Sequence, residues 1–96
     1  MPAYVIVYQE TEIRDPDSLA EYKARTRAAR GEHALTPRVV YGAIEPLEGQ
    51  PPEAVIMVEF PTVEEARAWY NSPEYQDALP YRLGAADYRA IIVEGI

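Results

Sequence analysis

The amino-acid sequence predicts an α+β protein, built as a four-stranded antiparallel sheet with both helices on one face. Segments rich in Val, Ile and Tyr occur four times, and such segments form strands. Helix-start signals, in which an Asp, Thr or Ser precedes a helical pattern, follow the first and the third of these segments. The length of 96 residues fits a single domain, which we expect to span residues 1–96.

The first strand is predicted over Ala3–Gln9, which contains no breaker and is apolar enough to be buried on both faces. Asp15 and Pro16 then predict a helix start, because Asp caps free amide groups and Pro suits the first helical position. Gly31 predicts the end of this helix. Residues at helical spacing within it are Leu19, Tyr22 and Thr26.

The middle of the chain predicts two further strands joined by a turn. Pro37 precedes the second strand, which we expect over Arg38–Glu45. The segment Glu48–Pro52 contains one Gly and two Pro, a composition typical of turns. The strongly apolar segment Ala54–Phe60 is predicted to be the third strand.

The last third of the chain predicts two consecutive helices. Thr62 with Glu65 three residues later forms a capping box. Ser72 before Pro73 is a second N-cap signal, so we expect a short extra helix to begin where the first one ends. Pro80 is expected to kink this extra helix or to end it early, because proline cannot donate a backbone hydrogen bond.

A final strand over Asp87–Glu94 completes the order βαββαβ, the split βαβ or ferredoxin-like arrangement. The third strand carries apolar residues on both faces. Val55 and Met57 share one face, and Ile56 and Val58 share the other. An open apolar sheet face is rare on a monomer. We therefore expect a C2 homodimer through the sheet face; the alternative is a curved sheet whose second face is only partly apolar.

Composition excludes several classes of function. The net charge of −7 argues against nucleic acid and against an anionic membrane surface as partners. No apolar run approaches the ~20 residues of a membrane span, and the N-terminus lacks a signal-peptide pattern, so we expect a cytoplasmic protein. The chain has no Cys and a single His, His33, and carries no nucleotide motif. We expect neither a metal nor a cofactor.

Short motifs along the whole chain resemble one family. The longest is Ala68–Gln76, and the others are Pro2–Val7, Asp15-Pro16, Leu47–Gly49, Val58–Pro61, Arg82 and Val93–Gly95. With these motifs the chain resembles the domain of unknown function called DUF1330. That family is similar to the dimeric α+β barrel proteins, which include antibiotic-biosynthesis monooxygenases and YCII-like and EthD-like proteins. The resemblance implies a ferredoxin-like protomer, a sheet-to-sheet homodimer and a ligand cavity between the helices and the sheet of each protomer.

One segment departs from the family pattern. Members have a His-Gly-Gly-Arg-like turn after the first helix, and the corresponding segment here is Gly31–Arg38. Thr36 and Pro37 stand in place of the glycine pair. Arg38 matches the family's arginine, and the resemblance implies a substrate-binding role for it.

Two residues are candidates for proton transfer. His33 is the only side chain with an ordinary pKa near neutrality and would act as general acid or base at the cavity mouth; the alternative is a solvated loop residue. Glu59 would act similarly if it faced the cavity, because burial raises the pKa of a carboxyl group. Its alternative is a strand-end residue that is solvated or paired with Arg38 or Arg89.

Four residues are candidates for ligand binding. Tyr75 and Arg82 are seven residues apart, on one face of a continuous helix, and together would hold an anion. The alternative is a core tyrosine and an arginine paired with an acid. Tyr70 and Asn71 would lie at the cavity rim, or at the surface, with Asn71 as a helix C-cap.

Further aromatics have less specific interpretations. Trp69 is predicted to be in the core, because it lies in helical register with Ala66. Four strand tyrosines are expected to bury a ring and to hydrogen-bond at an edge, or to form a binding wall for a flat ligand. They are Tyr4, Tyr8, Tyr41 and Tyr88.

Three functions follow as hypotheses. The first is a cofactor-free enzyme, of the monooxygenase, isomerase or cyclase type, that acts on a small aromatic or polyketide-like compound. The second is a non-catalytic domain that binds a small aromatic or anionic ligand in the same cavity. The third is a structural dimer module whose aromatics only fill the core.

Overall fold

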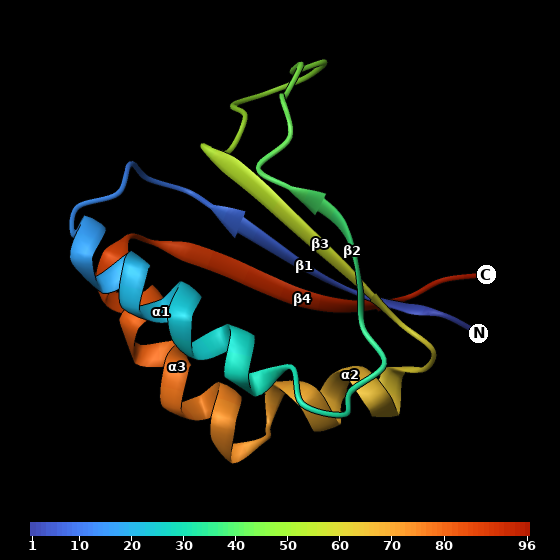
Figure 1. The fold of residues 1–96 in the computed structure, drawn as a ribbon. Helices are drawn as coiled ribbons and strands as arrows, with labels where there is room; N and C mark the ends of the chain where they lie inside the picture. Colours follow the sequence, from blue (N-terminus) through green and yellow to red (C-terminus); the bar gives the residue numbers. More distant parts are fainter.

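The computed structural model describes residues 1–96 and has the predicted α+β ferredoxin-like βαββαβ fold. The four strands form one antiparallel sheet in the order β2-β3-β1-β4. Figure 1 shows α1 and α3 side by side across one face of this sheet, with α2 at the end nearer to both termini. The elements are β1 (Ala3–Gln9), α1 (Pro16–Ala29), β2 (Thr36–Val40), β3 (Ala54–Phe60), α2 (Val63–Tyr70), α3 (Pro73–Ala85) and β4 (Tyr88–Glu94).

Each helix begins at its predicted cap. In all three cases an oxygen of the capping side chain accepts a backbone N–H three residues later, which satisfies an amide that the helix itself leaves free. The backbone N–H of Ser18 donates to Oδ1 of Asp15 at 3.1 Å. The backbone N–H of Glu65 donates to Oγ1 of Thr62 at 3.1 Å, and that of Tyr75 donates to Oγ of Ser72 at 3.2 Å.

The second strand differs from its prediction. It was expected over Arg38–Glu45 and runs over Thr36–Val40. Tyr41 ends it, because its φ of +57° lies in the left-handed region and breaks the extended backbone. The strand also starts earlier than predicted, since β2 is an edge strand and an edge strand tolerates Pro37.

The helix that begins after Ser72 is also longer than predicted. α3 runs for 13 residues to Ala85 and does not end at Pro80, so the short helix of the pair is α2. Pro80 is exposed, whereas Leu79 and Arg82 on either side of it are buried. This packing holds both halves of α3 in place despite the missing backbone bond. The last strand begins at Tyr88, one residue later than predicted.

The core lies between the helices and one face of the sheet. Val5 lies opposite Val58 and Val7 opposite Ile56 in the register of β1 with β3, so all four face the helices. Aromatic rings from three elements complete this layer. They are Phe60, Trp69 and Tyr75, with centroid distances of 5.5 Å from Phe60 to Trp69 and 4.1 Å from Trp69 to Tyr75.

The other face of the sheet carries no helix (Figure 1). Ile6 lies opposite Met57 on one side and opposite Ile91 on the other, and all three belong to this open face. Ile91 is 46% exposed and Val93 is 41% exposed. The open face is therefore apolar, as the third strand predicted.

Candidate functional site

The main cavity of the protein is an open pocket of about 630 Å³ between α1 and the β2–β3 half of the sheet. Its floor is formed by side chains from the two central strands, β1 and β3, on their helix-facing side. These are Val5, Val7, Ile56 and Val58. The floor is apolar because the helix-facing residues of β1 lie opposite those of β3, and both sets are apolar. Such a floor suits the hydrocarbon or aromatic body of a ligand.

The inner wall of the pocket is aromatic and carries three hydrogen-bonding groups. Tyr22 comes from α1, Trp69 from α2 and Tyr75 from α3. The hydroxyl oxygens of Tyr22 and Tyr75 are hydrogen-bonded at 2.9 Å. The Nε1 atom of Trp69 is buried and has no hydrogen-bond partner, which is uncommon for an indole N–H.

Tyr22 stays protonated under all ordinary conditions. Burial raises the pKa of its hydroxyl well above the usual value, and the neighbouring Tyr75 raises it further, while Arg82 lowers it slightly. The Tyr22 hydroxyl is therefore neutral, and because one hydroxyl of the Tyr22–Tyr75 pair donates to the other, the pair keeps one O–H group that can donate to a ligand. A ligand oxygen that takes up negative charge would be stabilised by such a donor.

The rim of the pocket is positively charged. Lys23 and Arg27 line it from α1, and Arg30 lines it from the C-cap position of the same helix. None of them has a carboxylate within 4.0 Å: Lys23 lies over the ring of Tyr41 at 4.9 Å, and Arg30 donates to the carbonyl oxygen of Leu35.

These unpaired cations stand out in an acidic chain. The protein has 16 acidic and 9 basic side chains, so acids are available to pair with every base. Four bases are paired with carboxylates, namely Arg14, Arg25, Arg38 and Arg89. Three of the five unpaired bases line one pocket, which gives that pocket a local charge opposite to that of the whole protein.

Arg82 lies deeper, behind the aromatic wall. It is only 3% exposed, although it carries a full positive charge. Its guanidinium carbon lies 5.8 Å from the ring centroid of Tyr22 and 4.9 Å from that of Tyr88. Tyr75 and Arg82 are thus both buried residues of α3, but only Tyr75 lines the pocket. Their joint role as an anion site stays a prediction.

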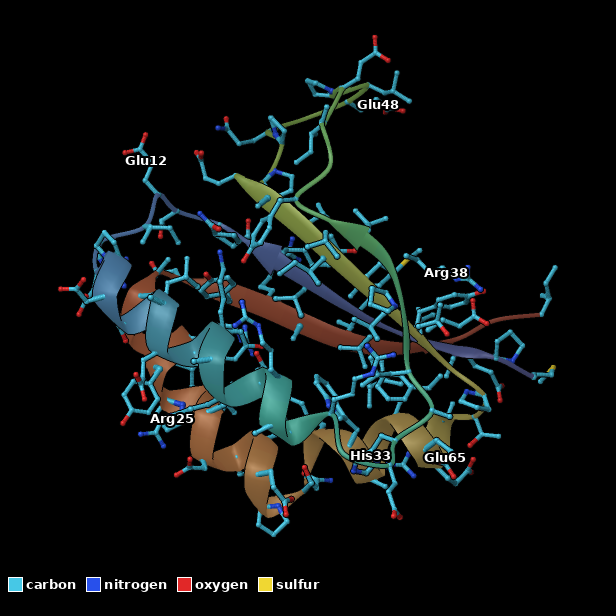
Figure 2. All side chains as sticks on the ribbon, in the orientation of Figure 1. Glu12, Arg25, His33, Arg38, Glu48 and Glu65 are labelled. Atoms are coloured by element: carbon cyan, nitrogen blue, oxygen red, sulfur yellow. The ribbon has the colours of Figure 1, made fainter.

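The two proton-transfer candidates lie outside the pocket. Glu59 faces the open side of the sheet, opposite Tyr4, and its Oε1 accepts a bond from Nε of Arg38 at 3.0 Å. The ion-pair alternative is therefore the arrangement found, and it occupies Arg38 as well. His33 lies in the turn between α1 and β2, partly buried, and does not line the pocket (Figure 2). Its role stays a prediction.

The remaining candidates are near the pocket without lining it. The ring of Tyr70 packs against that of Tyr75 in a tilted arrangement, with 5.3 Å between centroids, and Tyr70 borders a smaller apolar hollow of about 230 Å³ beside β4. Asn71 is exposed and is the C-cap of α2, the alternative interpretation of this residue. Neither is brought into the main pocket.

Sequence reasoning missed the residues of the rim and part of the wall. Arg27 and Arg30 are also explained as cations near the C-terminus of a helix, so their presence alone did not indicate a pocket. Tyr22 was assigned to the helix only by its spacing. The spacing of Lys23, Arg27 and Arg30 at i, i+4 and i+7 places them on one helix face, and this was the available signal.

Two further properties concern metals and membranes. No group of three or more His, Cys, Asp or Glu side chains is arranged to hold a metal ion. None of the helices has both the length and the apolar character that crossing a membrane requires.

Comparison with known proteins gives a family and a fold. The family model described as "Domain of unknown function (DUF1330)" matches residues 2–96. No curated protein matches the chain. Solved structures match over nearly the whole chain at low identity, which shows the fold alone.

Three of these structures are informative. A dimeric ferredoxin-like protein of unknown function from Jannaschia sp. CCS1 is 15% identical, with a TM-score of 0.69, and the match covers 99% of this chain and 100% of that one. An EthD family protein from Bacillus halodurans is 14% identical, with a TM-score of 0.66 and full coverage of both chains. A putative antibiotic biosynthesis monooxygenase from Nitrosomonas europaea is 16% identical, with a TM-score of 0.61 and coverage of 99% and 90%.

Proposed function

This chain belongs to the DUF1330 family, and we propose that it binds a small aromatic anion in the pocket between α1 and the sheet. The observation that carries this proposal is the combination of an apolar, aromatic pocket with a rim of three unpaired cations in a protein of net charge −7. The aromatic body of the ligand packs on Val5 and Val58, and its acid group meets Lys23 and Arg27. A pocket of about 630 Å³ is in the range of small-molecule sites.

The binding experiment compares ligands that differ only in charge. Isothermal titration calorimetry with benzoate and salicylate should give measurable binding, whereas benzamide and benzyl alcohol should bind at least tenfold more weakly. Equal affinity for the charged and the neutral compounds would contradict the role of the rim. Binding of neither series would contradict the aromatic pocket itself.

The rim is tested by a double variant, Lys23→Gln with Arg27→Gln. Each partly exposed charge contributes up to about 1 kcal/mol, roughly fivefold in affinity, so benzoate should bind about 10 to 25 times more weakly. The matched control is Arg67→Gln, which removes an exposed and unpaired cation of α2 that does not line the pocket. An equal loss in the control would mean that only net charge matters.

The proposal includes a homodimer through the open sheet face. Its support is the exposed apolar strip that includes Ile91 and Val93, together with structural neighbours that are described as dimeric. Burial of this strip against a second copy would remove apolar surface from water in both protomers.

A cofactor-free enzyme is the second candidate function, and the inner wall favours it. The one free O–H group of the Tyr22–Tyr75 pair and the unpartnered Nε1 of Trp69 supply donors for an oxyanion on the ligand. A phenolate or enolate held there would itself supply electrons to O₂ or undergo isomerisation or cyclisation. Two structural neighbours are described as EthD and monooxygenase proteins, which is consistent with this class.

Measurement of turnover distinguishes a catalytic function from simple binding. Oxygen uptake and product formation are followed with a panel of phenols that bind in calorimetry. Tyr75→Phe removes one hydroxyl and leaves the ring in the core, so it should abolish most of the turnover while affinity changes little. Tight binding with no turnover of any bound phenol would leave the non-catalytic function.

A further inference from the structure

The most unusual polar group in this protein is the guanidinium of Arg82. Two of its nitrogens, Nε and Nη1, are buried and have no hydrogen-bond partner. No carboxylate lies within 4.0 Å of it, although the chain has 16 acidic residues. A buried cation without a counter-charge is strongly destabilising. An anion bound next to Arg82 would therefore stabilise the folded protein.

A second buried donor lies in the same region. The Oη atom of Tyr88, at the start of β4, is buried and also lacks a partner. Burial raises the pKa of this hydroxyl, and the neighbouring Tyr41 raises it further, while Arg82 lowers it. Tyr88 is therefore protonated at neutral pH and able to donate its hydrogen.

The protein itself supplies only partial compensation. The guanidinium of Arg82 lies between two aromatic rings, those of Tyr22 and Tyr88, and ring faces attract cations weakly. Rings leave the N–H groups unsatisfied, however, because directed hydrogen bonds need an acceptor. Nε and Nη1 of Arg82 and Oη of Tyr88 are therefore three buried polar atoms of one region that have no hydrogen-bond partner.

We propose that Arg82 and Tyr88 form a binding site for a small monovalent anion, of halide or carboxylate size, behind the ring of Tyr22. This site is separate from the main pocket, since neither residue lines that pocket. The anion neutralises the charge of Arg82 and accepts hydrogen bonds from Arg82 and from Tyr88. It therefore stabilises the folded protein, and the ligand proposed for the main pocket is not needed for this effect.

Two sources supply the same anion chemistry. One is a free ion such as chloride, held permanently as part of the fold. The other is the carboxylate of a ligand in the main pocket, which reaches Arg82 when the ring of Tyr22 moves aside and the Tyr22–Tyr75 hydrogen bond opens. From either source, the group that binds to Arg82 carries a single negative charge.

The first experiment is crystallography of the unmodified protein grown in sodium bromide. Anomalous scattering should reveal one bromide within hydrogen-bonding distance of Arg82 and Tyr88. A second crystal soaked with benzoate distinguishes the two sources, because a carboxylate that reaches Arg82 removes the bromide signal, whereas a separate site keeps it. A water molecule in this position, with no bromide signal in either crystal, would overturn the proposal.

Thermal unfolding tests the same site in solution. The ionic strength is held constant with sodium sulfate, whose divalent anion does not match a site for a single negative charge. At a bromide concentration ten times its Kd, the ratio of folded to unfolded protein should rise about elevenfold. Tyr88→Phe, which removes only an unpartnered hydroxyl, should keep the fold and lose most of this response.

Arg82→Met removes the charge and retains much of the apolar stem, and it should abolish the bromide response completely. The control is Arg67→Met, which removes an exposed and unpaired arginine and should keep the full response. If Arg82→Met and the unmodified protein respond alike to bromide, the anion acts elsewhere and the site is wrong.

Discussion

The two faces of the sheet are similar in composition but differ in what covers them. On the helix-covered face, Val5 is 3% and Val7 is 7% exposed. On the open face, their neighbour Ile6 is only partly buried, and Ile91 is 46% exposed. Alternation along a single strand therefore places equally apolar side chains in two different environments.

This difference indicates where each face can act. The helix-covered face holds both a packed aromatic layer and a pocket of about 630 Å³ within one protomer. The open face has no pocket of comparable size and no covering element within the chain. The function proposed above therefore places ligand binding within a single protomer and assembly on the opposite side of the same strands.

The largest expected effect is the loss of Tyr75 from the covered face. Tyr75 is 1% exposed and its ring contacts those of Trp69, Tyr70 and Tyr22. Tyr75→Ala should lower the free energy of unfolding by about 3–5 kcal/mol, because it removes a large buried ring and leaves a cavity. Urea denaturation monitored by circular dichroism measures this loss.

The matched variant on the open face is Ile91→Ala, studied at low protein concentration. Because Ile91 is already half exposed in the protomer, it should cost less than about 1 kcal/mol. Similar losses of unfolding free energy for both variants would remove the distinction between the helix-covered face and the open face.

The fold was predictable because its signals are local. Asp15, Thr62 and Ser72 cap the three helices in the structure as the sequence predicted. The errors have tertiary causes: α3 passes through Pro80 because its two halves are held by packing, and β2 ends where Tyr41 adopts a positive φ. Neither packing nor a left-handed tyrosine has a signature in the local sequence.

The candidate site was less predictable for a related reason. Tyr75 and Arg82 were singled out together, and both are buried residues of α3, but which of them lines the pocket depends on how α1 packs. Glu59 illustrates the same limit, because strand alternation leaves its face undetermined until the register is known. A pocket between non-adjacent elements is set by tertiary structure, which sequence spacing does not specify.

The second prediction concerns the open face alone. Ile91→Lys places a charge in the middle of the proposed dimer interface, and burial of an unpaired charge is unfavourable. The dissociation constant of the dimer should rise by at least about 100-fold, roughly 2.7 kcal/mol, as measured by sedimentation equilibrium. The protomer should keep its fold and its benzoate affinity.

Leu83→Lys is the control for this variant. Leu83 is an exposed leucine of α3, 54% exposed, on the helical side of the molecule. It should leave the dimer unchanged. If the unmodified protein is a monomer at millimolar concentration, the open face has another role and the comparison of the two faces must be revised.

The third prediction is a loss of stability at alkaline pH that arises on the covered face. Burial and the neighbouring Tyr75 raise the pKa of Tyr22 well above the ordinary value of 10.0. Below pH 10 this hydroxyl is neutral in both the folded and the unfolded chain. Above pH 10 the unfolded chain releases the proton and the folded chain keeps it, so stability falls as the pH rises toward the pKa of the folded state.

For Tyr22 the loss amounts to roughly 1 kcal/mol by pH 11. Urea denaturation of the unmodified protein and of Tyr22→Phe at pH 9 and pH 11 measures it. The unmodified protein should lose roughly 1 kcal/mol more than the variant between these two pH values, because phenylalanine has no proton to release. Equal losses in the two proteins would mean that Tyr22 ionises as readily in the folded state as in the unfolded one. Its hydroxyl would then be accessible to solvent, and the inner wall of the pocket would resemble the open face rather than a protected interior.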